Sequence, residues 1–422
     1  MTLQFIGTDS DGFTPAGNGD MVVVVASGRL SIQGFGDAFD FAGLSSVSLV
    51  VLGSIFSEDG DAVSSDGGSS ALKVTVDPGG SITGASDGIE LNGNSHVVIN
   101  HGLVQGLSDA AVQMLGASSK VTNFGTMAAS RGVIMDAADG QVVNHGLIHG
   151  VTSVGVSLST GGSLLNTGII TSAAVAVVMS GPEGTLRNSG EISSLGANAF
   201  SGSTGIDVVQ NSGLIAGDVA LGDGADLLRN NGGRIVGDVD TGAVADKVLN
   251  RDGSIDGDLL LDDGNDLYRG GKGSTVEGRI LAGEGNDTVI GGDGEDVVEG
   301  GGGFDRLFGK AGDDVLKGGS GEDLIVGGGG DDEMTGGSQA DVFRIGRHSG
   351  DDLITDWTDG EDVLNLRALN IDITTSVGDV KAASQNRAGG VVIIDLDALG
   401  GDGSLEITGW NVNLMGSSDF IF

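Results

Sequence analysis

Short apolar runs alternate with glycine-rich polar turns along most of the chain. From residue 80, a phrase close to Asn-x-Gly-x-Ile returns every 21 to 23 residues, and a second apolar run lies between successive phrases. Each period therefore holds at least two short strands separated by turns. One period cannot bury its own apolar residues, so the periods are expected to stack into a β-solenoid. The asparagines that open the phrase are Asn100, Asn123, Asn144, Asn166, Asn188 and Asn211.

These asparagines fit the turns of a solenoid. Asparagine tolerates the left-handed backbone conformation and forms hydrogen bonds with its own backbone. In stacked turns the side chains would align into a ladder of amides. We expect this ladder to be structural; a row of ligand-binding amides is the alternative.

The period shortens toward the C-terminus. Gly-Asp pairs at 217–218, 237–238 and 257–258 are 20 residues apart, and from residue 282 to 344 the chain consists of seven contiguous nonapeptides of the form Gly-Gly-x-Gly-x-Asp-x-U-x, where U is apolar. Three residues after each turn would form a short strand with U pointing inward. The U residues are Val289, Val298, Leu307, Leu316, Ile325, Met334 and Phe343.

Seven nonapeptides in phase resemble the repeats of the repeats-in-toxin (RTX) family, the calcium-binding β-roll proteins. The resemblance covers residues 282–344. It implies an all-β fold: a right-handed parallel β-helix or β-solenoid that runs into a calcium-binding β-roll, with a β-rich C-terminal cap. We divide the chain into an N-terminal cap or irregular first coils (1–73), a solenoid with coils of 20–23 residues (74–281), the β-roll (282–344) and the C-terminal cap (345–422).

The nonapeptide turns carry the chemistry of a calcium site. Glycine permits a tight left-handed turn that exposes backbone carbonyls, and the aspartate adds a carboxylate. Ca²⁺ takes six to eight oxygen ligands, more than one turn supplies, so turns 18 residues apart would share an ion. The metal-ligating glycines expected at the fourth position are Gly285, Gly294, Gly303, Gly312, Gly321 and Gly330.

The aspartates at the sixth position fall into two columns, because two nonapeptides make one coil. One column holds Asp287, Asp305, Asp323 and Asp341, and the other holds Asp296, Asp314 and Asp332. Adjacent members would bind about five ions between them. Similar turns carry Asp226 and Asp266 into the first column upstream, with Asp246 as a decayed copy between them.

The charge supports folding that depends on Ca²⁺. The formal net charge is −39; residues 1–210 hold 18 acids and 5 bases, and residues 211–422 hold 41 acids and 15 bases. Such a chain repels nucleic acid and anionic membranes. Stacked carboxylates oppose folding until cations neutralise them, so binding becomes folding free energy. The chain has no Cys, which excludes a disulfide scaffold.

Export is expected to depend on the C-terminus. Met1–Phe13 contains no Lys or Arg, so it lacks the charged start of a secretory signal. Asp352–Leu366 resembles the segment that follows the β-roll in serralysin-type secreted proteins, with Trp357 in place of Phe and Asn365 in place of Asp. The ending Asp419–Phe422 resembles the uncleaved signal of type I secretion, which implies an extracellular or cell-surface protein without an N-terminal signal peptide. No apolar run near the N-terminus is long enough to span a membrane.

No catalytic residue is predicted. The zinc motif His-Glu-x-x-His of serralysins is absent, and residues 1–210 offer five Lys and Arg and no Tyr for chemistry in a groove. The alternative is a secreted polysaccharide-modifying β-helix enzyme, a lyase or an epimerase. We instead expect a calcium-binding structural or adhesive protein, such as a surface layer, filament or matrix component. Its expected partners are Ca²⁺, the type I secretion machinery and further copies of the chain in an oligomer or end-to-end polymer.

Overall fold

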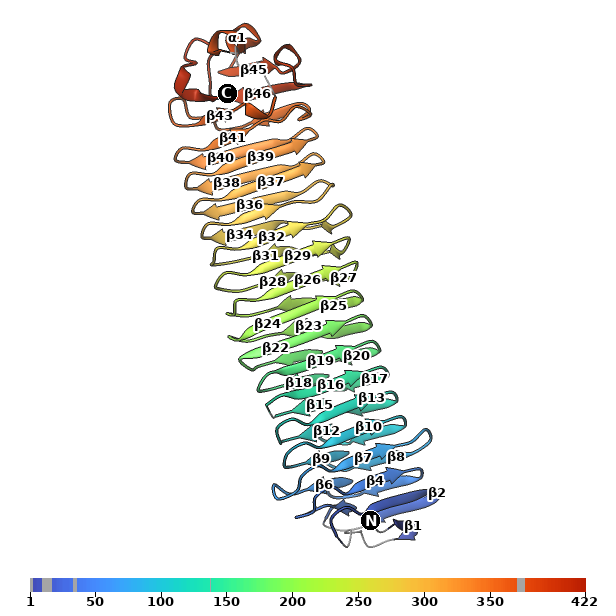
Figure 1. Ribbon diagram of the computed structural model, residues 1–422. Helices are drawn as coiled ribbons and strands as arrows, with labels where there is room; N and C mark the ends of the chain where they lie inside the picture. Colours follow the sequence, from blue (N-terminus) through green and yellow to red (C-terminus); the bar gives the residue numbers. More distant parts are fainter. Residues whose placement is uncertain (1–2, 10–16, 33–35, 137, 370–375) are drawn as a thin grey trace. The chain divides into compact units, whose positions relative to one another are not determined.

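The computed structural model describes the 422-residue chain except residues 1–2, 10–16, 33–35, 137 and 370–375. It consists of two compact units, Met1–Gly222 and Asp223–Phe422. Each unit is built from short parallel strands stacked coil on coil (Figure 1). The predicted all-β parallel solenoid is confirmed.

In the N-terminal unit each coil contributes one strand to each of three columns of parallel strands. The first column contains β4 Ser48–Val51, β7 Lys73–Val76, β10 Val97–Asn100, β13 Lys120–Asn123, β16 Gly140–Asn144, β19 Gly162–Asn166, β22 Glu183–Asn188 and β24 Ile206–Asn211. The second contains β5 Ser54–Ser57, β8 Ser81–Gly84, β11 Leu103–Gly106, β14 Thr126–Ala129, β17 Leu147–Gly150, β20 Ile169–Ser172, β23 Glu191–Ser201 and β25 Leu214–Ala220. The third contains β3 Phe39–Asp40, β6 Val63–Ser65, β9 Ile89–Leu91, β12 Ala110–Met114, β15 Arg131–Met135, β18 Val156–Leu158 and β21 Val177–Met179, which pairs with the end of β23.

The first two strands of this unit join the columns at their start. β1 Leu3–Asp9 pairs with β2 Met21–Ile32, and β2 is long enough to pair with both β4 and β5. Val22 and Val24 of the apolar run noted in the sequence are fully buried. The apolar core of the N-terminal unit therefore reaches the coil that contains β2.

The six asparagines of the repeated phrase form the predicted ladder. Each Nδ2 donates to the Oδ1 of the next asparagine over 2.8–2.9 Å, from Asn100 to Asn211. The same Nδ2 atoms also donate to backbone carbonyls, as Asn144 does to Gly146 and Ile169. All six side chains are buried. The ladder thus satisfies the polar groups of the turns inside a narrow aliphatic core.

Replacing one amide should leave its ladder neighbours without partners. We expect Asn144→Ala to destabilise the N-terminal unit by about 2–3 kcal/mol, because buried polar groups of Asn123 and Asn166 lose a hydrogen bond. Gln141→Ala is the matched control, since Gln141 is an exposed residue of the same strand. Thermal unfolding followed by circular dichroism would measure both; equal losses would contradict a structural role for the ladder.

The C-terminal unit begins with three columns and continues with two. The first column contains β26 Leu227–Asn231, β29 Lys247–Arg251, β32 Leu267–Gly270, β35 Thr288–Ile290, β37 Arg306–Ala311, β39 Leu324–Gly329, β41 Val342–Arg344, β43 Val363–Asn365 and β47 Phe420–Ile421. The second contains β28 Val239–Asp240, β31 Leu259–Leu260, β34 Ile280–Glu284, β36 Val297–Gly302, β38 Val315–Ser320, β40 Glu333–Ser338, β42 Asp352–Ile354 and β46 Ser404–Thr408. The third contains β27 Arg234–Val236, β30 Ser254–Ile255 and β33 Thr275–Val276, where it ends.

The end of the third column explains the shorter period of the nonapeptides. A coil of 20 residues carries three strands, whereas the 18-residue coils carry two strands and two glycine-rich turns. The seven predicted inward residues of the nonapeptides are all fully buried. Within this unit, strand pairing is continuous from the long coils to the short ones.

The last part of the unit departs from the repeat. β44 Ser384–Arg387 pairs antiparallel with β45 Val391–Asp395, which in turn pairs antiparallel with β46. The same region holds the helix α1 Val377–Ala382 and the 3-10 turns η1 Arg367–Leu369, η2 Asp397–Leu399 and η3 Ser417–Asp419. The rings of Trp357 and Trp410 lie 4.6 Å apart, and Phe420 lies 5.6 Å from Trp410. These aromatic side chains cover the core that the last coil leaves open. Across the described ranges, no helix has the length and apolar character needed to cross a membrane.

Candidate metal centre

A ladder of aspartates follows the first column of the C-terminal unit. Each aspartate stands in the turn just before a strand, and its Oδ1 accepts a hydrogen bond from the backbone N–H of the aspartate one coil earlier, over 2.6–3.0 Å. The members are Asp226, Asp246, Asp266, Asp287, Asp305, Asp323, Asp341 and Asp362. The repeat thus places one carboxylate per coil on this side of the solenoid.

A second ladder of the same design lies on the other side. It consists of Asp296, Asp314, Asp332 and Asp352, joined over 2.8–3.2 Å. All nine aspartates singled out in the sequence belong to one ladder or the other. The structure therefore brings them together in two rows rather than at one point.

Three members were not singled out in the sequence as ligands. Asp246, interpreted there as a decayed copy, makes the same contacts as its neighbours, so that interpretation is wrong for the carboxylate. Asp352 and Asp362 carry the ladders into the cap, 20 and 21 residues after the preceding members. They lack the first two glycines of the nonapeptide but keep the fourth-position glycine, as Gly350 and Gly360, both with positive φ. The signal that remained was therefore Gly-x-Asp-x-apolar, without the leading pair of glycines.

The second carboxylate oxygen of most members is buried and makes no hydrogen bond to any described residue. These Oδ2 atoms belong to Asp246, Asp266, Asp287, Asp305, Asp314, Asp323, Asp332 and Asp352. A buried charged oxygen without a partner is costly. The ladders therefore require protons or cations.

Burial raises the pKa of the ladder carboxyl groups. Burial, followed by repulsion from the neighbouring carboxylates, raises the pKa of Asp305, Asp314 and Asp341 from 3.8 to about 7. Burial likewise raises the pKa of Asp352 to about 8 and that of Asp287 to about 6. At neutral pH a cation would hold these groups in the ionised form.

The first glycine of four of the nonapeptides leaves room for converging oxygens. A Cβ added to Gly300 would lie 2.5 Å from Asp305 Oδ2 and 2.6 Å from the carbonyl oxygen of Gly318, one coil later. The same pair of contacts, a carboxylate of its own turn and a carbonyl of the next coil, occurs at Gly291, Gly309 and Gly318. Any side chain there would fill the space where these oxygens meet.

The fourth-position glycines serve the close stacking of turns. Gly285, Gly303, Gly312, Gly321 and Gly330 have φ between +113° and +139°. A Cβ on any of them would collide with backbone of the same position one coil earlier, as at Gly321 against the carbonyl of Gly303. Gly294 does not share these two features with the other five glycines. Its φ is outside the left-handed region, and an added Cβ would meet no atom within 4 Å. No nonapeptide turn precedes it on that side.

This contrast supplies a matched pair of substitutions. Gly321→Ala should destabilise the C-terminal unit by about 1–3 kcal/mol, through backbone strain and overpacking against the preceding turn. Gly294→Ala occupies the equivalent position and should change stability by less than about 0.5 kcal/mol. Chemical denaturation at saturating Ca²⁺ would compare them; equal effects would show that the turns are not closely stacked.

A lysine ammonium lies at the start of the second ladder. Lys310 takes the position of a glycine with φ +89°, and its Nζ donates to the carbonyls of Gly291 over 2.5 Å and Gly270 over 2.8 Å. It lowers the pKa of Asp296, although burial raises that pKa more. The chain thus supplies its own cation next to the first carboxylate of this ladder.

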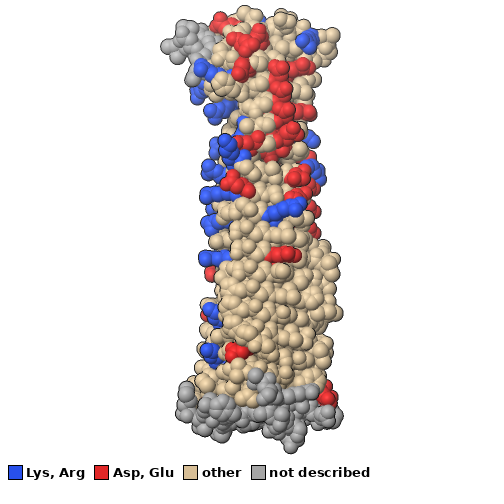
Figure 2. Space-filling model, turned by 90° about the vertical axis from the view of Figure 1, so that its right-hand side faces the viewer, with Lys and Arg blue, Asp and Glu red and all other residues tan. Residues whose placement is uncertain are grey.

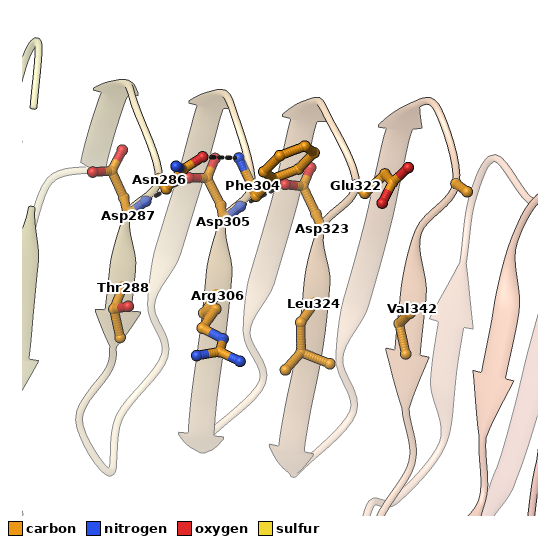
Figure 3. A pocket seen from close by; sticks show the side chains of 11 residues that line it. Asn286, Asp287, Thr288, Phe304, Asp305, Arg306, Glu322, Asp323, Leu324 and Val342 are labelled. Atoms are coloured by element: carbon orange, nitrogen blue, oxygen red, sulfur yellow. Dashed lines mark hydrogen bonds between the residues drawn. The ribbon is translucent and has the colours of Figure 1, made fainter. Parts of the chain in front are cut away.

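An open groove of about 520 Å³ runs along the outer side of the first ladder. Figure 3 shows the carboxylates of Asp287, Asp305 and Asp323 in a row on neighbouring coils, with Phe304 beside them and Arg306 farther along the strand. Figure 2 shows acidic side chains gathered on the C-terminal unit, whereas the face of the N-terminal unit in that view is largely uncharged. The groove is open to solvent along the turns, although the ladder aspartates at its base are themselves about 1% exposed.

The residues present fit calcium. Buried unpartnered carboxylate oxygens and converging backbone carbonyls from two adjacent turns are the hard oxygen ligands that Ca²⁺ prefers. The class defined by the fold and the site is a calcium-binding β-roll. A family model described as the RTX calcium-binding nonapeptide repeat (4 copies) matches residues 278–307 and 308–343. The chain thus carries RTX calcium-binding repeats, as its nonapeptides predict.

Comparisons with curated proteins and with solved structures do not extend this assignment beyond the repeats. A search of curated proteins finds no match for the chain. One similar solved structure is the solution structure of the AlgE6R3 subunit from the Azotobacter vinelandii mannuronan C5-epimerase. It is 26% identical, covers 32% of this chain and 81% of its own, and superposes with a TM-score of 0.28. A score this low carries no argument about the activity of this chain.

Proposed function

We propose that this protein is a secreted structural or adhesive protein without catalytic activity that folds on binding several Ca²⁺ ions outside the cell. The observation that carries the proposal is the pair of aspartate ladders with buried, unpartnered Oδ2 atoms. The strand spacing of a β-sheet places successive carboxylates about 5 Å apart, where like charges repel. Ions shared between successive turns would remove that repulsion.

The expected calcium affinity supports an extracellular role. Extracellular calcium modules bind with Kd values of about 10⁻⁴–10⁻³ M, well above cytosolic calcium concentrations. A chain of this kind would stay without its C-terminal fold in the cytosol and acquire it after export. We propose that residues 345–422, which include the serralysin-like segment and Asp419–Phe422, act as the type I secretion signal as well as the cap.

An export assay on a fusion tests the signal. Residues 345–422 appended to an unrelated, calcium-independent reporter should carry it into the medium of cells that hold a type I exporter. The same fusion without the exporter is the control and should remain inside. A reporter retained in both strains would contradict the proposed secretion route.

Exposed apolar side chains support a role in assembly. On the N-terminal unit, Leu195 is 88% exposed, and Leu107, Phe124 and Ile206 are each about half exposed or more. The net charge of −39 opposes association until Ca²⁺ neutralises part of it. Self-association, if head to tail, would be an open heterologous contact that yields filaments or sheets.

Light scattering of the full chain tests the assembly. The scattering mass should rise with protein concentration at millimolar Ca²⁺ and should fall to that of a monomer in chelator. Leu195→Ser should weaken the rise, whereas Gln141→Ala, also on the surface of this unit, should not. A monodisperse monomer under all conditions would contradict self-assembly and leave adhesion to a foreign surface.

A further inference from the structure

Three acidic side chains converge in the N-terminal unit, outside the aspartate ladders and outside any nonapeptide. Asp61 stands in the turn before β6, Asp87 stands in the turn before β9, and Glu90 lies within β9. One carboxylate oxygen of each lies within 4.8 Å of those of the other two. Asp61 is 9% exposed and Asp87 is 3% exposed, so two of the three carboxylates are buried.

The backbone fixes these carboxylates in place. Asp61 Oδ1 accepts from the N–H of Asp87 over 3.0 Å, and Asp87 Oδ1 accepts from the N–H of Ala110 over 2.5 Å. Glu90 Oε1 accepts from Asn92 Nδ2 over 2.9 Å. The arrangement runs opposite to the ladders of the C-terminal unit, where each Oδ1 accepts from the coil before.

A separate observation points to a ligand at this place. Ser64 is directly opposite Glu90 in the parallel register of β6 and β9, so both side chains lie on the outer face of the sheet. Ser64 is 8% exposed, yet its Oγ makes no hydrogen bond with any residue that the structure describes. A buried hydroxyl oxygen without a hydrogen-bond partner, on the same face as Glu90 and directly opposite it, is a second observation that points to a ligand here.

Nearby bases do not neutralise the cluster. The positive charge of Arg131 lowers the pKa of Asp87, but less than burial raises it. The Arg131 guanidinium is already paired with another carboxylate, since its Nη2 lies 2.5 Å from Asp109 Oδ1. It also donates to Gln113 Oε1 over 3.4 Å. On the other side, Asp40 is the register partner of Ser64 and adds a further carboxylate to the same face. The local charge is therefore negative and concentrated on oxygen ligands.

We propose that Asp61, Asp87 and Glu90, with Ser64 Oγ, bind one Ca²⁺ ion in the N-terminal unit. Every ligand is oxygen and none is His or Cys, which favours Ca²⁺ over Zn²⁺. Ca²⁺ also accepts irregular sets of six to eight oxygens, with water completing the set at the partly exposed Glu90. The ion would link successive coils near the start of the solenoid, and its binding does not depend on the proposed secreted role.

Hydrogen–deuterium exchange of the full chain tests the site. In the wild-type protein, peptides covering residues 60–66 and 84–92 should exchange at least about tenfold more slowly in millimolar Ca²⁺ than in chelator, since binding stabilises the bound state. Asp61→Asn/Glu90→Gln should remove this difference, because neutral amides keep the hydrogen bonds but not the charge. Calcium-dependent protection of residues 287–341 should remain in the variant.

The matched control is Asp139→Asn/Glu183→Gln, which removes two exposed carboxylates of the same unit and should behave as wild type. Calcium-dependent protection that persists in Asp61→Asn/Glu90→Gln would overturn the site. Absence of any calcium effect on residues 60–92 in the wild-type chain would overturn it as well, whether or not the variant folds. Because residues 287–341 are read in the same experiment, failure here is distinct from failure of the nonapeptide ladders.

Discussion

Removal of calcium should unfold the short coils of the C-terminal unit while the N-terminal unit keeps its β-structure. The N-terminal coils are held by neutral amides and an aliphatic core, whereas the C-terminal coils bury a row of carboxylates. Circular dichroism should show partial loss of β signal in chelator, restored by millimolar Ca²⁺. Exchange measurements should place the loss in residues 287–341.

Removing two ladder aspartates should weaken calcium-dependent folding far more than removing two surface acids. Asp305→Ala/Asp323→Ala removes adjacent members of the first ladder and should raise the calcium midpoint of folding by about tenfold or more, a change of ~1.4 kcal/mol or greater. Asp293→Ala/Glu295→Ala removes the same charge from exposed positions of the same unit and should shift it little. A β spectrum unchanged by chelator in the wild-type protein would contradict coupled folding.

Without calcium, the C-terminal unit should be more stable in mild acid than at neutral or alkaline pH. Burial raises the pKa of the ladder carboxyls above 3.8, to about 6 for Asp266 and Asp332 and to about 7 for Asp305 and Asp341. The folded state therefore keeps protons that the unfolded chain has already released. The stabilisation is complete below pH 4 and is lost as the pH rises through about 6 to 8.

Thermal melts of calcium-free protein between pH 4.5 and pH 8 test this sign. The calcium-free C-terminal unit should melt cooperatively at pH 4.5, and its transition should shift to lower temperature and disappear toward pH 8, where the short coils are unfolded without calcium. The calcium affinity should rise over the same interval as protons cease to compete for the carboxylates. Saturating Ca²⁺ should abolish this shift. A calcium-free unit that becomes more stable toward pH 8 would mean that the ladder carboxyls are solvated rather than buried.

Sequence periodicity predicted most of the fold because each period repeats the same local chemistry. The spacing of Asn100 to Asn211 predicted an amide ladder, and the 18-residue spacing of the nonapeptides separated the aspartates into two rows, which the structure also has. Those inferences required only that equivalent turns of successive coils stack directly on one another. The third strand of each long coil was harder to see, since runs such as β27 and β30 have two or three residues and no distinct turn signal.

Features that depend on contacts between unlike segments could not be read from the chain. Asp352 and Asp362 lie outside the nonapeptide phase, and their place in the ladders follows from how the first residues of the cap stack on the last coil. The cluster of Asp61, Asp87 and Glu90 arises where coils of unequal length align, so no fixed spacing marks it. Lys310 stands where the nonapeptide has its second glycine, and the sequence does not show that its ammonium bonds the carbonyls of Gly270 and Gly291 in other coils.

The hydrogen bonds of the ladders all point the same way, which makes the C-terminal unit directional. If Asp323 loses its side chain, the backbone N–H of Asp305 in the coil before loses its acceptor, while Asp341 in the coil after keeps its own bond to Asp362. Damage at one turn should therefore spread toward the N-terminus and spare the coils that follow. In a series of single ladder variants, hydrogen exchange should therefore increase first in the coil on the N-terminal side of each substituted aspartate.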